Sequence, residues 1–345
     1  TIEWVENKKI TNSEKEILGF DKKSIKSVLQ FHQTLPNYQK TPLIDLKELA
    51  KYCGVKKIWV KDESKRFGLN AFKVLGGSYS IGKCLSEILN VDISELPFSV
   101  LTSTEIKKKI GDVTFITATD GNHGRGVAWM AKHLQQKSVV YMPKGSSEMR
   151  LKAIQNEGAD ASITDFNYDD AVRLANKRAN ENNWIMVQDT AWEGYEKIPL
   201  WIMQGYSTIM SEIIQELEKV KEKPTHVFLQ AGVGSFAGAM QALLTKIYGK
   251  EEPITIICEP HRANCIYKSF KENDGKPHNV TGDLNTIMAG LACGEPNTIS
   301  WEILRDYSNF ALSCDDSISA KGMRVLSSPL GEDKRIISGE SGAVG

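Results

Sequence analysis

Two stretches of the sequence share one pattern, VTFITATDGNHG at residues 113–124 and VFLQAGVGSFAG at residues 227–238. Each begins with apolar, β-branched and aromatic residues, which favour a strand, and continues into a turn that contains glycine. A helical pattern follows each turn. A strand that leads through a glycine turn into a helix is typical of an α/β fold, and such a turn presents backbone N–H groups that can bind an anion.

The same alternation extends over the rest of the chain. Strands are predicted at 57–61, 113–117, 138–142, 185–188, 227–230 and 254–258, and helices at 72–89, 122–134, 148–156, 168–180, 195–217 and 235–247. This order indicates mainly parallel sheets covered by helices on both faces. Right-handed crossovers then place the functional loops at the carboxyl ends of the strands. Residues 96–110 are expected to form a surface excursion between elements.

The composition narrows the class of protein. The chain has 43 Lys and Arg against 43 Asp and Glu, so its formal net charge is zero. A nucleic-acid-binding protein or a polybasic membrane anchor needs a basic surplus, so we expect neither nucleic acid nor a membrane as a partner. The uncharged stretch 227–245 contains glycines and glutamines, which fit a strand, turn and helix better than a membrane span. No targeting segment is visible, and a cytoplasmic location is expected.

The cysteines and the end of the chain give two further expectations. The six cysteines form no CxxC pair and show no zinc-ligand spacing, so no metal site is predicted. Residues 341–345 form a glycine-rich turn, and we expect the natural chain to continue beyond them.

Lys73, within NAFKVLGG at 70–77, is a candidate for covalent chemistry. The neutral amine is the nucleophile, and the apolar neighbours Phe72, Val74 and Leu75 would favour that form. Taken alone, however, a lysine in such a position favours a solvated residue on a helix face.

Three other segments of the sequence each allow two interpretations. The turn 119–124 could bind an anion, or could be a simple turn in which Asp120 caps the helix. The loop 232–238 could cradle a phosphate, but its GxGxxxG spacing is a weak dinucleotide fingerprint, and a nicotinamide oxidoreductase stays open at this point. Asp189 follows the predicted strand 185–188 and could be a reacting group or a cap.

Taken in order, these blocks resemble the fold-type II pyridoxal-phosphate enzymes, the relatives of threonine dehydratase and the tryptophan synthase β subunit. The lysine, the Gly-Asn-His turn, the glycine loop and a Ser-Gly-Ala turn near the end follow in that order. Within this group the chain resembles the diaminopropionate ammonia-lyase family in RFGLNAFKVLGGSY (66–79), TATDGNHGRGVAW (117–129), VQDTAWEGY (187–195) and GLACGEPN (290–297).

The resemblance implies two α/β lobes with the active site between them, and pyridoxal 5'-phosphate as the cofactor. Residues 1–75 and 190–345 would form a larger cofactor-binding domain, and residues 76–189 a smaller α/β domain. Lys73 would carry the cofactor covalently, and Asn122 would contact its ring hydroxyl. The cofactor phosphate would be held by the loop residues Gly232, Val233, Gly234 and Ser235. The pyridine nitrogen would be contacted by Ser341, or by Ser338 in its place. The substrate carboxylate would be bound by Thr119, Asp120, Gly121 and His123.

The chain departs from the wider fold-type II pattern at several positions. Leu75 stands where an arginine is usual, and Val233 and Ser235 interrupt the usual run of glycines. The residue before Gly-Asn-His is generally small and uncharged, whereas here it is Asp120. A carboxylate beside the substrate pocket can bind a second ammonium group or take a proton.

The implied reaction is α,β-elimination from 2,3-diaminopropionate, which gives pyruvate and ammonia. Asp120 and Asp189 follow different strands and could take the Cα proton from opposite faces, so both D- and L-isomers are expected as substrates. A serine or threonine dehydratase and a non-catalytic pyridoxal-phosphate-binding protein are alternatives. A homodimer is expected by analogy, and a disulfide between Cys265 and Cys293 is a further hypothesis.

Overall fold

The computed structural model describes residues 1–8 and 17–345, so residues 9–16, which belong to the predicted larger domain, lie outside the described residues. Within the described part, the first sheet has four parallel strands. Their order across the sheet is β6 (Asp160–Ile163), β5 (Lys137–Met142), β4 (Thr114–Ala118) and β7 (Ile185–Met186).

The second sheet has four strands in the order β1 (Ile2–Glu6), β10 (Phe310–Cys314), β9 (Ile254–Pro260) and β8 (His226–Gln230). β8, β9 and β10 are parallel, and β1 runs antiparallel to β10. The prediction of mainly parallel sheets is therefore confirmed. The predicted strand 57–61 is present but shorter, because only β3 (Trp59–Lys61) forms, and it pairs antiparallel with β2 (Leu43–Asp45) in a separate ribbon, outside the two parallel sheets.

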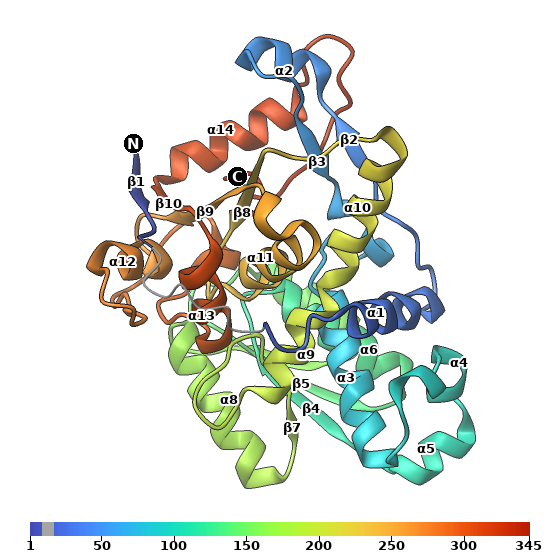
Figure 1. Cartoon of the computed structure of the whole chain (residues 1–345). Helices are drawn as coiled ribbons and strands as arrows, with labels where there is room; N and C mark the ends of the chain where they lie inside the picture. The colour runs from blue at the N-terminus through green and yellow to red at the C-terminus, as the bar shows by residue number, and fades with distance from the viewer. Residues whose placement is uncertain (9–16) are drawn as a thin grey trace.

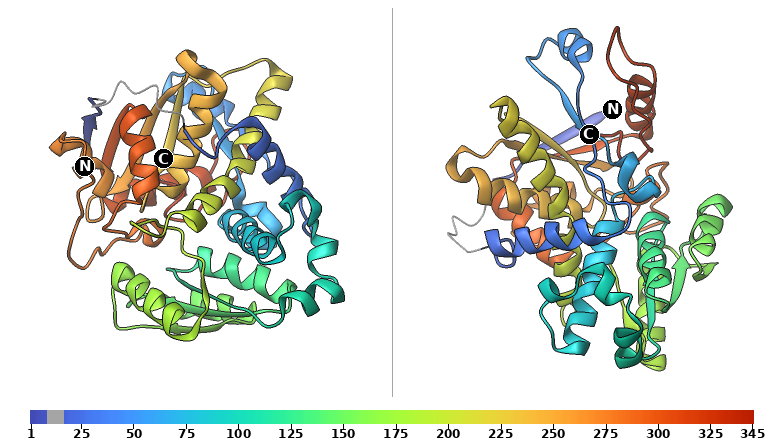
Figure 2. Two further views of the ribbon diagram at one scale, coloured as in Figure 1. Left: turned by 60° about the horizontal axis from the view of Figure 1, so that its bottom comes forward. Right: turned by 90° about the vertical axis from the view of Figure 1, so that its right-hand side faces the viewer.

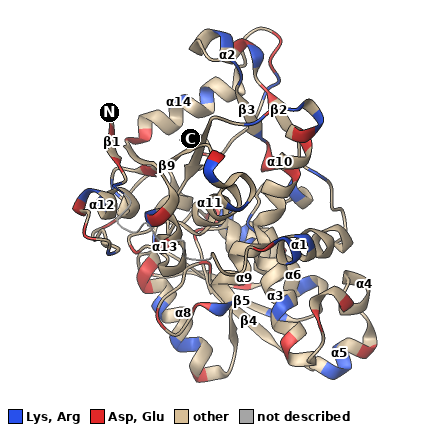
Figure 3. Ribbon diagram, in the orientation of Figure 1, with Lys and Arg blue, Asp and Glu red and all other residues tan. Residues whose placement is uncertain are grey.

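Helices flank both sheets, as Figures 1 and 2 show. In the half that holds β4 to β7 they are α3 (Val74–Leu89), α4 (Phe98–Leu101), α5 (Thr104–Ile110), α6 (Asn122–His133), α7 (Glu148–Asn156) and α8 (Tyr168–Asn182). The others are α1 (Lys22–Thr34), α2 (Lys47–Cys53), α9 (Lys197–Gly205), α10 (Ser207–Val220), α11 (Ser235–Tyr248), α12 (Cys265–Glu272), α13 (Thr298–Tyr307) and α14 (Asp316–Ser327). Basic and acidic residues are interspersed over both halves (Figure 3), in keeping with the zero net charge.

Three predictions need correction. The helix expected at 195–217 is two helices, α9 and α10, which meet at Tyr206. The helix expected from residue 72 begins at Val74, so Lys73 is the residue that precedes α3. Residues 96–110 are not a surface excursion, because they form α4 and α5, which bury Leu101 and Ile106.

The stretch 227–245 is confirmed as a strand, a turn and a helix, β8 to α11. Within the described residues, no helix combines the length and the apolar character that crossing a membrane requires.

Glycines allow α3 to approach α6 and α9 closely just after Lys73. A Cβ atom added at Gly205 of α9 would lie 2.5 Å from the Leu75 carbonyl oxygen. One added at Gly126 of α6 would lie 2.7 Å from the Val74 Cα. Such contacts exclude any side chain at these positions, so the backbone that carries Lys73 is seated directly on two neighbouring helices.

A buried charge cluster fixes the segment that leads to Lys73. Glu212 of α10 is fully buried and accepts hydrogen bonds from Arg66 at 2.8 and 2.9 Å, from Lys61 Nζ at 2.6 Å and from the Tyr38 hydroxyl at 2.7 Å. Burial would raise the pKa of Glu212, but Arg66 and Lys61 outweigh it and lower the pKa to about 2. The cluster ties the short 3-10 segment Glu63–Gly68 to α10.

Replacing Glu212 with Gln is expected to destabilise the cofactor-free protein by about 3–5 kcal/mol at pH 7, because two buried cations lose their counter-charge. The folded-state pKa of about 2 lies below the ordinary value of 4.5. The wild-type advantage is therefore fully present above pH 4.5 and is lost as the pH falls toward 2. Urea unfolding of both proteins at pH 7 and pH 3 measures it.

Glu216→Gln is the matched control, since Glu216 lies on the same helix in partly exposed ion pairs and should change stability by less than about 1 kcal/mol. A gap between wild type and Glu212→Gln that is the same at pH 7 and pH 3 would contradict this account of the cluster.

Candidate active site

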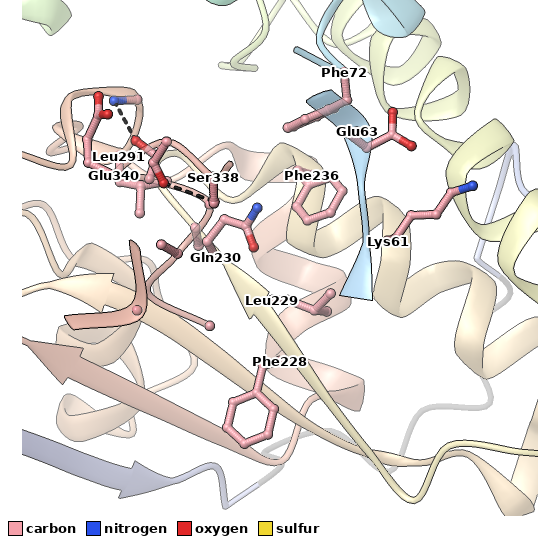
Figure 4. Close-up of a pocket in the computed structure, with 18 of the residues that line it drawn as sticks. Lys61, Glu63, Phe72, Phe228, Leu229, Gln230, Phe236, Leu291, Ser338 and Glu340 are labelled. Carbon is pink, nitrogen blue, oxygen red and sulfur yellow. Dashed lines mark hydrogen bonds between the residues drawn. The ribbon is translucent and has the colours of Figure 1, made fainter. Parts of the chain in front are cut away.

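A cavity of about 1740 Å³ lies between the two sheets and reaches the β2–β3 ribbon. In Figure 4, Phe72 and Phe236 lie on one side of it, with ring centroids 4.8 Å apart, and Leu291, Ser338 and Glu340 lie on the other. The predicted site residues that line it are Lys73, Thr119, Asp120, Asn122, Asp189, Gly232, Val233, Gly234, Ser235, Ser338 and Ser341. The predicted residues Gly121 and His123 are buried beside it and do not line it.

Lys73 and Asp189 form a partly buried ion pair at the centre of the site. Lys73 Nζ donates to Asp189 Oδ2 at 2.9 Å, and the Asp189 side chain is 5% exposed. Burial alone would lower the pKa of Lys73, but the Asp189 carboxylate, with smaller effects of Tyr206 and Asp120, raises it well above its usual value. The expectation that apolar neighbours hold Lys73 neutral is therefore wrong, because the adjacent carboxylate reverses their effect.

Side chains from two further elements hold Asp189. The Tyr168 hydroxyl, at the start of α8, donates to Asp189 Oδ1 at 3.1 Å, and Gln188 Nε2 lies 3.2 Å from the same oxygen. Burial would raise the pKa of Asp189, but the Lys73 ammonium and the hydrogen bonds from Lys73 and Tyr168 hold it well below its ordinary value. The carboxylate is thus fixed in position and kept ionised.

The turn after β4 offers unused donors. The Thr119 hydroxyl accepts from the Gly121 N–H at 3.0 Å, which shapes the turn. The N–H groups of Asp120, Asn122, His123 and Gly124 donate to no acceptor in the part of the chain that the structure describes. Free N–H groups at the start of α6 form a site for an anion such as a carboxylate.

Asp120 faces the cavity from the same turn. Its Oδ2 lies 3.7 Å from Arg150 Nη1, and Arg150 of α7 also forms an ion pair with Glu340. Among the described residues no hydrogen bond engages the Asp120 carboxylate. One of its lone pairs is therefore available to a cationic or acidic group in the cavity.

The loop between β8 and α11 is a second cradle of free donors. The N–H groups from Gly232 to Ala237 have no acceptor within residues 1–8 and 17–345. The Ser235 hydroxyl is already engaged, since it donates to the Asp189 carbonyl oxygen and accepts from Asn297 Nδ2 at 2.8 Å. The backbone of this loop, rather than the Ser235 hydroxyl, is thus the group offered to a phosphate.

The two candidate serines of the C-terminal segment differ in what their hydroxyls do. Ser341 Oγ accepts from the Gly290 N–H at 3.0 Å, and its own hydrogen has no acceptor in the described chain. Ser338 Oγ donates to the neighbouring Gly339 carbonyl at 3.1 Å. Ser341 is therefore the better placed to donate to a ring nitrogen in the cavity.

The disulfide hypothesis is wrong. Cys265 and Cys293 are both buried free thiols. Cys265 Sγ lies 3.5 Å from the Gly232 carbonyl oxygen, and burial raises the pKa of each thiol. Within the described residues no group of three or more His, Cys, Asp or Glu side chains could hold a metal ion.

Sequence reasoning missed Tyr168, Gln188, Arg150 and Tyr206. Tyr168 and Arg150 reach the site only through tertiary packing, and no local motif marks them, whereas Gln188 directly precedes Asp189 within the quoted motif at 187–195. Tyr206 is almost fully buried, and its hydroxyl has no hydrogen-bond partner in the described chain, although it lines the cavity near Lys73. Its position in the middle of a predicted continuous helix gave no sign of this.

Comparison with known proteins agrees with this geometry. The profile of the family described as "Pyridoxal-phosphate dependent enzyme" matches residues 34–345. A diaminopropionate ammonia-lyase of Salmonella typhimurium is 56% identical over 320 residues, which is 92% of this chain and 79% of that protein. An L-threonine dehydratase of Pasteurella multocida is 22% identical over 307 residues, 89% of this chain and 51% of that protein.

A crystal structure of the Escherichia coli diaminopropionate ammonia lyase "in complex with aminoacrylate-PLP azomethine reaction intermediate" superposes with a TM-score of 0.90 at 50% identity. The match covers 100% of this chain and 85% of that one. The chain belongs to the diaminopropionate ammonia-lyase family of the fold-type II pyridoxal-phosphate dependent enzymes.

Proposed function

We propose that this chain catalyses the pyridoxal-phosphate-dependent α,β-elimination of 2,3-diaminopropionate, in both its D- and L-forms, to pyruvate and ammonia. One observation carries the proposal. A lysine amine and two carboxylates, Asp120 and Asp189, meet in one cavity, and the two carboxylates follow different strands, β4 and β7.

The groups of the cavity fit pyridoxal phosphate. Lys73 supplies the amine for the covalent link, and the free N–H groups of 232–237 suit the phosphate. Asn122, whose side chain is exposed to the cavity, would contact the ring hydroxyl, and the free Ser341 hydrogen would meet the pyridine nitrogen. When bound, the cofactor supplies an electron sink that acidifies the Cα proton of an amino acid.

The chain's own groups would bind and orient the substrate. The free N–H groups of Asp120 and 122–124 suit the substrate carboxylate, in the same turn that places the Asp120 side chain in the cavity. An ionised Asp120 attracts a second ammonium group, which diaminopropionate has and serine and threonine lack. This favours diaminopropionate over the substrates of the dehydratases, whose similarity to this chain is distant.

The two carboxylates would divide the proton transfer. The Cα proton of the D-isomer and that of the L-isomer point to opposite faces once the substrate is held by its carboxylate and amine, so one base cannot serve both. We assign Asp120 to the D-isomer and Asp189 to the L-isomer. Tyr168 and Gln188 keep Asp189 in place when Lys73 leaves it.

We also propose a domain division, an oligomeric state and a cellular location for this protein. The larger cofactor-binding domain would comprise 1–75 and 190–345, and the smaller domain 76–189. The distribution of strands supports this division, since β4 to β7 fall within 76–189 and β8 to β10 follow it. A homodimer and a cytoplasmic location are proposed by analogy with related enzymes.

Lys73→Ala should abolish the covalent link to pyridoxal phosphate, because no other group replaces its amine. Borohydride should fix the cofactor to the peptide that contains Lys73 in the wild type and to no peptide in the variant, as read by mass spectrometry. Lys83→Ala, in the helix α3 that follows Lys73, is the control and should label as the wild type does. A borohydride-stable adduct in Lys73→Ala would place the link on another lysine.

Asp120→Asn should impair mainly the D-isomer and Asp189→Asn mainly the L-isomer, each by about 10²–10⁴-fold in turnover. The rate of pyruvate release from each pure enantiomer measures both effects. Asp170→Asn, in an exposed ion pair on α8, is the control for general damage. Equal losses on the two isomers in both variants would show shared substrate binding in place of face-specific proton transfer.

A further inference from the structure

His123 follows Asn122 at the start of α6, and its side chain is fully buried behind Asp189. Its Nε2 lies 2.7 Å from the Val187 carbonyl oxygen. A carbonyl only accepts, so Nε2 carries the hydrogen and Nδ1 carries a lone pair. That Nδ1 has no hydrogen-bond partner in the described chain, and it lies 4.0 Å from Asp189 Oδ2.

An unpartnered, fully buried acceptor is rare and costs free energy. Here it faces a second acceptor, Asp189 Oδ2, and the same oxygen takes the hydrogen bond of Lys73 at 2.9 Å. Asp189 Oδ2 is therefore within 4.0 Å of both Lys73 Nζ and His123 Nδ1. The unpartnered Nδ1 of His123 can therefore accept one proton on the side that faces Asp189.

The chemistry of Lys73 requires such an acceptor. Lys73 is held as an ammonium by Asp189, but only the neutral amine can attack a carbonyl group. When Lys73 forms its covalent link, it must give up this proton in a buried site. The ion pair with Asp189 then disappears, and the carboxylate loses its cationic partner.

We propose that His123 receives the proton of Lys73 through Asp189 Oδ2 when Lys73 binds the cofactor, and that the resulting imidazolium replaces Lys73 as the cation beside Asp189. The Nζ–H bond of Lys73 breaks, the proton passes by way of Asp189 Oδ2, and an Nδ1–H bond forms on His123. The neutral amine would then form the C=N bond as the C=O bond of the cofactor aldehyde breaks, and the oxygen would leave as water with the two remaining Nζ hydrogens. In the transfer to His123 one proton moves, the charge of the site is unchanged, and no oxidant or reductant takes part. His123 is thus a positioning residue, which acts through Asp189.

The charges around His123 support this exchange. Burial lowers the pKa of His123, the Asp189 carboxylate raises it, the Lys73 ammonium lowers it further, and Asp120 raises it. Asp189, Lys73 and Asp120 are the charged groups that face the imidazole. Loss of the Lys73 charge removes one of the two effects that keep His123 neutral, while both carboxylates stay.

The first test uses nitrogen-15 NMR of the histidines and needs no turnover. In the cofactor-free wild type at pH 7, His123 should be neutral with its hydrogen on Nε2. In cofactor-free Lys73→Ala its pKa should rise, and in the wild type loaded with pyridoxal phosphate it should be an imidazolium. A His123 that is neutral at pH 7 in the loaded protein, with an unchanged pKa in Lys73→Ala, would overturn the proposal.

The second test measures how fast the cofactor-free protein captures pyridoxal phosphate covalently, by absorbance, across pH. His123→Gln keeps a donor for the Val187 carbonyl but cannot take a proton, so capture at pH 7 should slow about 10²-fold and recover at higher pH. His32→Gln is the matched control, since His32 is equally buried but has partners on both nitrogens, Thr208 and the Leu75 carbonyl. His32→Gln should capture the cofactor with the wild-type pH profile.

This inference rests on the proposed use of Lys73, and the two can fail separately. If the wild type forms no borohydride-stable adduct at Lys73, the proposed function fails. If the wild type forms that adduct and His123→Gln captures the cofactor with the wild-type rate and pH profile, only the role of His123 is refuted.

Discussion

The partly buried ion pair between Lys73 and Asp189 is the interaction on which the site depends. Two charges removed from water are tolerated only when they are paired and hydrogen-bonded. Asp189 meets this condition through Lys73, Tyr168 and Gln188, which come from three different parts of the chain. The pair also joins the start of α3 to the segment after β7, two parts of the chain that are far apart in the sequence.

The rest of the site follows from the same constraint on buried charge. The substrate carboxylate and the cofactor phosphate would be bound by neutral backbone N–H groups, in the turn at 120–124 and in the loop at 232–237. These groups add no fixed charge to the site. In the proposed function, the carboxylates of Asp120 and Asp189 lie where a cation or a proton would be bound. Under the proposed function, the additional carboxylate of Asp120 in the Gly-Asn-His turn would distinguish a diamino acid from a hydroxy amino acid by charge.

The sequence predicted those parts of the fold and site that depend on local patterns. The strand, glycine turn and helix units at 113–124 and 227–238 stand where they were expected, as does α7 at 148–156. The remaining features of the fold depend on tertiary packing, which local patterns do not reveal. The helix 195–217 divides where Gly205 touches the backbone of α3, and residues 96–110 fold because Leu101 and Ile106 find a core. The ammonium state of Lys73 could not be predicted from its apolar neighbours, because Asp189 lies 116 residues further along the chain.

The central claim is that this site eliminates ammonia from a diamino acid. Its most direct test is the ratio of ammonia to pyruvate released by the purified, cofactor-loaded protein from pure D- and pure L-2,3-diaminopropionate, with L-serine and L-threonine as comparison substrates. The account predicts two molecules of ammonia for each pyruvate from both enantiomers, one from the β-carbon and one from the hydrolysed product, and turnover well above that of serine or threonine. Release of one ammonia for each 2-oxo acid from serine or threonine, with diaminopropionate left unconsumed, would contradict it and identify a dehydratase.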